Sequence, residues 1–199
     1  MAAMIFALTL LVCFSRSIAG IIELSDADKQ VFVDLHNKYR KEAGATAMNK
    51  LKWNEGLAGF ATKVAERCVF EHSDNSERKN LAGFASVGEN AFSQPDATTT
   101  PTPQQVVELW ASEKTTYGDN DVCLDIYECG HFTQIVWAPT TDIGCATINC
   151  PGDHFLAFCE YGVAGNMIGE EPYVTGDPGS ECSTKYPGKT ADADGLCGK

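Results

Sequence analysis

The chain of 199 residues is poor in positive charge, and this scarcity excludes several classes of partner. It has 15 Lys and Arg against 27 Asp and Glu, which gives a formal net charge of −12. An acidic surface repels nucleic-acid phosphates and anionic lipid headgroups. We therefore expect no binding to nucleic acid or heparin-like polymers, and no docking to membranes through charge.

Long hydrophobic runs are also scarce. The only candidate lies near the start, in "MAAMIFALTLLVCFSRSIAG", where the apolar stretch of residues 4–14 is too short to span a bilayer. Small residues follow it at Ser17 and Ala19, a pattern typical of a secretory signal cleaved after Ala19. Residues 1–19 are therefore predicted to be a signal peptide, and the remaining chain of about 180 residues a secreted, extracellular protein without a membrane span.

Cysteines occur without any Cys-x-x-Cys spacing, so the usual zinc-finger patterns are absent. No Asn-x-Ser/Thr sequon is present either, and N-glycosylation is not expected. Of nine cysteines, Cys13 lies in the predicted signal. The even set that remains, in an oxidising compartment, predicts four disulfides; its members are Cys68, Cys123, Cys129, Cys145, Cys150, Cys159, Cys182 and Cys197.

Three segments show the pattern of amphipathic helices. The first follows Ser25, with Asp28 in the capping-box position, and ends at Gly44. The second is "NEGLAGFATKVAERC", with Cys68 on its apolar face. The third is "TPQQVVELWASEK", in which Thr102 caps, Pro103 takes the first helical position and the buried stripe runs through Val106, Leu109 and Trp110.

The second half of the chain changes character after Gly144. "CATINC" and "FLAFCEY" read as two strands of a hairpin around "PGDH". Between the third helix and this hairpin, "HFTQIVW" alternates like a strand but is short enough for one or two helical turns, and periodicity leaves both open. From about Pro172 onward the composition favours a mostly irregular tail.

The histidines and two glutamates are the candidates for chemistry. His36 lies in a helical pattern and is expected to be a packed structural residue, and His154 is expected at a solvated hairpin tip. His72 and His131 each follow a cysteine, so their backbones should be fixed by disulfides. Glu89 lies in a predicted loop, "VGEN", and Glu113 at the edge of the third helix. Two imidazoles and two carboxylates can bind a divalent metal or act as general acids and bases. Ser73 is not expected to be a nucleophile, because the strand-turn-helix motif G-x-S-x-G is absent around it.

Several motifs together resemble one family. "GHFTQIVWAPT" (130–140) looks like the first signature of the CAP superfamily, which comprises cysteine-rich secretory proteins, insect venom antigen 5 and plant pathogenesis-related group 1 proteins. "FCEYGVAGNM" resembles the second, with Glu160 and Val163 in place of the usual amide and proline. "HNKYR", "LKWN", "CVFEHS", "GEN" and "LWASE" follow further landmarks in order, over roughly residues 25–173. A CAP domain over 20–173 and a tail over 174–199 are expected.

The resemblance implies an α+β fold, a three-layer α-β-α sandwich with a small, mostly antiparallel sheet, and a short helix at "HFTQIVW". It also implies a cleft in which His72 and His131 share a divalent ion, zinc where one is bound, with Glu89 and Glu113 orienting them. The family's six-cysteine pattern pairs Cys68 with Cys150, Cys123 with Cys129 and Cys145 with Cys159. This leaves Cys182 for Cys197.

Two functions follow from the resemblance. The first is an extracellular binding module for a sterol, a fatty acid or a protein, in defence, venom or signalling, with lipid captured near loop 114–128 and its tyrosines, Tyr117 and Tyr127. The second is a metal- or Glu/His-assisted hydrolase, which is weaker because catalytic zinc normally has three protein ligands. An ion-channel toxin would need a cysteine-dense C-terminal domain, and this tail has two cysteines.

Overall fold

A computed structural model describes residues 20–117, 123 and 125–198 of the chain, so the predicted signal peptide lies outside the described residues. Helices and strands are interspersed along it. In chain order the elements are β1 (Gly20–Ile22), α1 (Asp26–Glu42), β2 (Lys52–Trp53), α2 (Glu55–Ala65), β3 (Lys79–Leu81), β4 (Phe84–Gln94), α3 (Pro103–Ser112), the 3-10 turn η1 (Glu113–Thr115), α4 (Ile126–Ile135), β5 (Asp142–Cys150), β6 (His154–Gly162), α5 (Cys182–Lys185), β7 (Thr190–Ala191) and β8 (Cys197–Gly198).

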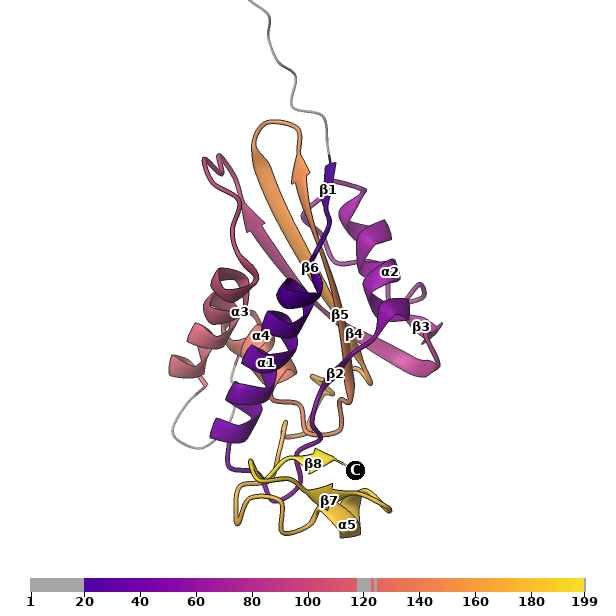
Figure 1. Ribbon diagram of the computed structural model, residues 1–199, viewed down its shortest axis with the longest axis vertical. Helices are drawn as coiled ribbons and strands as arrows, with labels where there is room; N and C mark the ends of the chain where they lie inside the picture. Colours follow the sequence, from indigo (N-terminus) through magenta and orange to yellow (C-terminus); the bar gives the residue numbers. More distant parts are fainter. Residues whose placement is uncertain (1–19, 118–122, 124, 199) are drawn as a thin grey trace, which may run out of the picture.

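The central sheet has the order β1-β5-β6-β4-β3, and β2 adds a short parallel pair to β5. The other pairings in this sheet are antiparallel. Helix α2 lies along one side of the sheet, and α1, α3 and α4 lie together on the other (Figure 1). The fold is therefore the predicted α+β sandwich of three layers.

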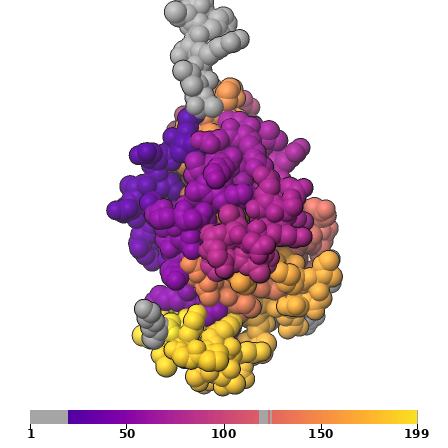
Figure 2. All heavy atoms as spheres, turned by 90° about the vertical axis from the view of Figure 1, so that its right-hand side faces the viewer, coloured from indigo at the N-terminus to yellow at the C-terminus, as the bar shows by residue number. Residues whose placement is uncertain are grey.

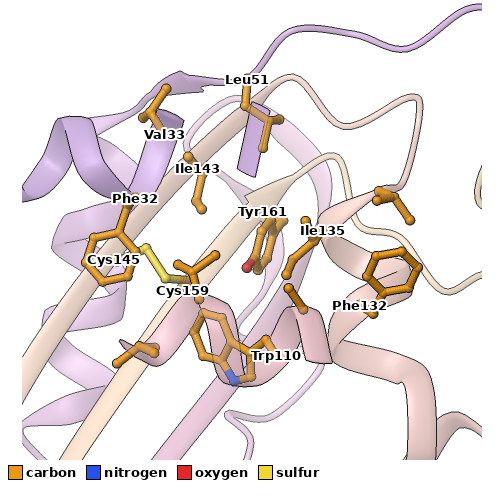
Figure 3. Close-up of a cluster of buried hydrophobic side chains, with 14 of the residues drawn as sticks. Phe32, Val33, Leu51, Trp110, Phe132, Ile135, Ile143, Cys145, Cys159 and Tyr161 are labelled. Carbon is orange, nitrogen blue, oxygen red and sulfur yellow. A yellow bond between two sulfur atoms is a disulfide. The ribbon is translucent and has the colours of Figure 1, made fainter. Parts of the chain in front are cut away.

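Strand β6 is buried along almost its whole length because helices cover both faces of the sheet. Phe155, Ala157, Cys159 and Tyr161 belong to the larger core beneath α1, α3 and α4. The alternate residues Leu156 and Phe158 belong to a second core beneath α2. Figure 3 shows the larger core, with the Cys145–Cys159 disulfide beside Phe32 and with Trp110 and Tyr161 among the aliphatic side chains.

The helix starts agree with the caps expected from the sequence. Ser25 and Asp28 form a reciprocal capping box at α1, and Thr102 and Gln105 form another at α3. The segment "HFTQIVW" is helical up to Ile135, as the resemblance implied. Helix α2, however, ends at Ala65, so Cys68 lies beyond the helix that the sequence predicted, although it packs against the same core as Ala61 and Val64.

Two further expectations about local structure are corrected. Leu109 is 56% exposed, and the buried face of α3 is instead completed by Val107 and Ala111. The reason is that α3 rests against α1 and α4, so its buried face is turned toward them. Glu89 lies in β4, a strand of 11 residues, where the sequence predicted a loop.

The eight cysteines form four disulfides, Cys68–Cys150, Cys123–Cys129, Cys145–Cys159 and Cys182–Cys197. These are the pairs that the resemblance implies. The first closes the longest loop, with a sequence separation of 82. Chain entropy alone gives such a crosslink about 4 kcal/mol of stabilisation.

Residues 174–198 gather at one end of the molecule, where Figure 2 shows them as a separate group of yellow atoms. They are tied to the segment after α1 through the bridges Ala45–Thr175 and Asn49–Cys197. Lys41 adds an ion pair with Asp194 at 2.6 Å. Within the described residues, none of the helices combines the length and the apolar character needed to cross a bilayer.

Arg40 lies at 0% exposure in the larger core and binds backbone oxygens instead of a carboxylate. Its guanidinium donates six hydrogen bonds of 2.6–3.2 Å, to the carbonyl groups of Asn49, Ile135, Trp137, Ala138 and Thr140. It thereby joins α1 to the last turn of α4 and to the chain that leads into β5. A positive charge is also favoured at a helix C-terminus by the helix dipole.

Candidate functional site: two histidine–glutamate pairs

The first candidate pair joins the segment after α2 to strand β4. His72 Nδ1 lies 2.7 Å from Glu89 Oε1. Ser73 adds two hydrogen bonds to the same carboxylate, from its backbone N–H at 3.0 Å and from its hydroxyl at 2.7 Å. Ser73 is thus bound to Glu89 and buried.

These bonds fix the charge of Glu89. Its burial favours the neutral acid, but the hydrogen bonds from His72 and Ser73, together with the neighbouring Glu160 and Arg78, outweigh burial and lower the pKa to about 2. Glu89 is therefore an acceptor at neutral pH, and His72 must donate from Nδ1. In the neutral imidazole, Nε2 then carries the free lone pair that a metal ligand needs. The His72 side chain is 57% exposed, so solvent reaches it.

The second pair brings α4 against the end of α3. His131 Nδ1 lies 2.6 Å from Glu113 Oε1. Oε2 of the same carboxylate accepts the backbone N–H groups of His131 at 2.9 Å and Phe132 at 3.2 Å. The ring of Trp110 stacks on His131 with centroids 5.9 Å apart and planes 14° from parallel. Glu113 thus holds both the backbone and the ring of His131. As for His72, the proton of the neutral ring lies on Nδ1.

A buried hydrogen-bond chain supports the second pair from the opposite side. Asn90 donates to the carbonyl oxygen of His131 and to the hydroxyl of Tyr161, both at 3.1 Å. The Tyr161 hydroxyl in turn lies 2.9 Å from Nε2 of His36, whose Nδ1 donates to Phe32. His36 is fully buried, as expected of a structural residue, and burial lowers its pKa to about 4. A neutral His36 accepts from Tyr161.

The sequence placed His154 at a solvated tip, but the structure shows it at the start of β6, partly buried. Its Nε2 lies 2.8 Å from the hydroxyl of Ser93. This imidazole is therefore held by the hairpin and takes no part in either pair.

A polar cleft of about 990 Å³ opens beside the first pair. His72, Ser73 and Glu89 line it, and so does Gln134, one turn beyond His131 on α4. His131 and Glu113 do not line it. A single cleft shared by all four residues stays a prediction.

The donor set is suited to a sparse zinc site. Both histidines direct Nδ1 to a carboxylate, which is the arrangement that orients zinc-bound imidazoles. Within residues 20–117, 123 and 125–198, no group of three or more His, Cys, Asp or Glu side chains is arranged to hold a metal. Zinc at His72 and His131 would therefore need water or an outside ligand to complete its usual four positions.

An apolar cavity of about 520 Å³ lies next to the polar cleft, beyond the segment 166–168. Its apolar lining residues include Ile126, Trp137, Met167, Ile168 and Pro172, and the polar residues Thr133, Asn166, Glu170 and Glu171 line it as well. Three of these apolar side chains are unusually exposed to solvent, Ile126 at 50%, Met167 at 40% and Ile168 at 104%. The sequence analysis named neither this cavity nor a binding role for residues 167–172.

The loop predicted to capture lipid, residues 114–128, lies partly outside the described residues, at 118–122 and 124. Its two tyrosines differ. Tyr117 is buried and packs against Phe132 and Tyr173, whereas Tyr127 is 91% exposed. Tyr117 therefore serves the core, because its ring is not open to a ligand.

Sequence reasoning also missed the roles of Asn90 and Glu160, and the stacking of Trp110 on His131. Glu160 is 0% exposed, and in the described part of the chain neither of its carboxyl oxygens has a hydrogen-bond partner of ordinary geometry. A lone acidic residue inside the apolar run "FLAFCEY" was the available signal. Asn90 and Trp110 gave none, because their partners are far away in the sequence.

Comparison with known proteins identifies the family. The model of the Cysteine-rich secretory protein family, CAP, matches residues 33–161. The chain is a CAP protein. Its match to peptidase inhibitor 16 of Bos taurus is 35% identical over 173 residues, and covers 82% of this CAP protein but only 35% of that relative. Scoloptoxin SSD976 of Scolopendra dehaani is 34% identical over 183 residues, with 80% and 82% of the two chains covered.

Solved structures agree with this assignment. BmVAL-1 aligns with a TM-score of 0.75 and 28% identity, covering 89% of this CAP protein and 96% of the other chain. The structure of NaASP2 with Zn²⁺ aligns with a TM-score of 0.71 and 26% identity, covering 88% and 97%. The second is a relative in which zinc is present.

Proposed function

We propose that this CAP protein is a secreted binding module that captures a sterol or fatty acyl ligand in the apolar cavity between α4 and residues 166–172. The observation that carries the proposal is the lining of that cavity, with Trp137 and Pro172 inside and exposed Ile126, Met167 and Ile168 around it. Apolar side chains are exposed to water here, and a ligand that covers them lowers the free energy of the system.

An extracellular setting supports the proposal. The family is described as secretory, and four disulfides are typical of oxidising compartments. A role in defence, venom or signalling, and a protein ligand in place of a lipid, are compatible with the same surface. We further propose that His72 and His131 hold zinc, with Glu89 and Glu113 as their orienting carboxylates.

Replacing Ile168 with aspartate tests the cavity. We expect sterol or fatty-acid affinity to fall by about tenfold to a hundredfold, since covering one large aliphatic side chain is worth about 1.5–3 kcal/mol. Folding should be unaffected because Ile168 is fully exposed. The measurement is lipid transfer or tryptophan quenching on purified protein.

The matched control is Val174 to aspartate, because Val174 is 56% exposed and does not line the cavity. Equal losses in the two variants would place the binding elsewhere. A peptide-cleavage panel on the same wild-type sample examines the hydrolase alternative. Cleavage without lipid binding would overturn the proposal.

Salt should not weaken lipid binding. The protein is strongly acidic, and an anionic headgroup gains no general attraction from its surface. Apolar contact is unchanged or strengthened when salt is added. Titrations with a fatty acid at about 0.05 M and about 0.5 M salt check this expectation, because the screening length shrinks severalfold over that range. A large loss of affinity at high salt would instead indicate binding through Arg78 and Lys79 in the polar cleft.

A further inference from the structure

The sheet places a second carboxyl group behind the first histidine–glutamate pair. Glu160 on β6 is the cross-strand partner of Glu89 on β4, and both residues belong to the face of the sheet that α2 covers. Side chains directly opposite in an antiparallel pair have Cβ atoms about 5 Å apart. Two carboxyl groups therefore meet in the interior, behind His72 and away from solvent.

The two members of this pair have unequal surroundings. Glu89 is held by three hydrogen bonds, one from His72 and two from Ser73, and all three stabilise its ionised form. Glu160 has no conventional partner for either oxygen in the described part of the chain and is completely buried. A buried carboxylate without donors is far more costly than a neutral acid.

Charges around Glu160 reinforce this difference. Burial raises its pKa well above the ordinary value, and the negative charge of Glu89 raises it further. Arg78 and Arg67 act in the opposite direction but do not outweigh these effects. Arg78 is also engaged elsewhere, since it donates to the Ser73 carbonyl and to Asn75.

We propose that Glu160 is a positioning residue, a neutral carboxylic acid that donates a hydrogen bond to Glu89 and so holds this carboxylate toward His72. The proton lies on Glu160, and Glu89 accepts on the side that His72 and Ser73 leave open. His72 is thereby held with Nδ1 protonated and Nε2 directed away from Glu89. The effect on zinc rests on the proposed function, whereas the protonation of Glu160 does not.

Infrared difference spectroscopy on the intact protein at neutral pH tests the protonation directly. We expect the carbonyl stretch of a protonated carboxyl group in the wild type and its loss in Glu160→Gln. Absence of that band from the difference spectrum would overturn the proposal. This measurement needs no metal, so it remains decisive even if the protein binds no zinc.

Unfolding in urea provides a second metal-free test. Glu160→Gln keeps a neutral donor that needs no proton on folding, whereas wild-type Glu160 must take one up. The wild type therefore loses stability relative to this variant as pH rises above about 4.3, the ordinary value for Glu. We expect the gap between the two urea midpoints to widen in favour of Gln from about pH 4.5 to about pH 8. A constant gap would contradict a neutral Glu160.

The positioning role is tested by comparing Glu160→Gln with Glu160→Leu, which removes the donor. Nitrogen NMR of His72 should show one tautomer, protonated at Nδ1, in the wild type and the Gln variant, and a mixture in the Leu variant. Zinc affinity should change in the same order. We expect a loss of up to about tenfold for the Leu variant, at the lower end of the losses seen when a residue that orients a metal ligand is replaced, and little change for the Gln variant. An unchanged tautomer in a folded Leu variant would show that Glu160 does not position Glu89.

Discussion

Replacing Arg40 with methionine is expected to lower the free energy of unfolding by at least about 3 kcal/mol, because several buried carbonyl groups lose their donor and each costs about 1–3 kcal/mol when left unpaired. Burial lowers the pKa of Arg40 to about 9, so the guanidinium is still charged at neutral pH. Its six bonds are all to backbone oxygens, and among the described residues no carboxylate pairs with it. The carbonyl groups of Trp137 and Ala138 keep the backbone N–H groups of Thr140 and Asn49 as donors, so the loss comes mainly from the other three carbonyls.

Urea unfolding followed by tryptophan fluorescence, with the disulfides kept oxidised, measures this loss. Lys41→Met is the matched control, since Lys41 is the next residue on α1 and forms a solvent-exposed ion pair with Asp194. Exposed pairs contribute about 0–1 kcal/mol. If Arg40→Met proved as stable as Lys41→Met, water would have replaced the guanidinium at these carbonyls.

Changing His131 to alanine is expected to abolish zinc binding, and changing Glu113 to glutamine to weaken it by about tenfold to a hundredfold. The first change removes one of the two proposed imidazole ligands. The second removes the acceptor that holds Nδ1 of His131 at 2.6 Å. Both variants should fold, because the core and the disulfides stabilise the domain.

Zinc titration calorimetry on wild type and variants measures these effects. Acidification from about pH 7.5 to about pH 5.5 should weaken zinc binding to the wild type, because protons compete for the imidazole nitrogens. His154→Ala is the control, since His154 is bonded to Ser93 and lies in neither pair. A His131→Ala protein that binds zinc as tightly as the wild type would make His131 a structural residue.

The positions of the helices could be predicted because helix caps are local. Ser25 with Asp28, and Thr102 with Gln105, lie three residues apart in the sequence and satisfy the backbone of the same turn. The hairpin of β5 and β6 was readable for a similar reason, since short apolar runs flank a Pro-Gly turn. Strand β4 was missed because its glycine, polar and apolar residues follow no single period.

The sequence by itself determined the acidic surface, the even set of cysteines for disulfides, the helix starts and the residues able to bind metal. Tertiary structure alone decided the rest. Helix α3 buries Val107 in place of Leu109 because α1 and α4 cover that side. Each histidine meets its glutamate across 17 or 18 residues, and Glu160 meets Glu89 across 71, through strand register and helix packing. Contacts at such separations leave no periodic signal in the chain, because periodicity records only which side of its own element a residue occupies.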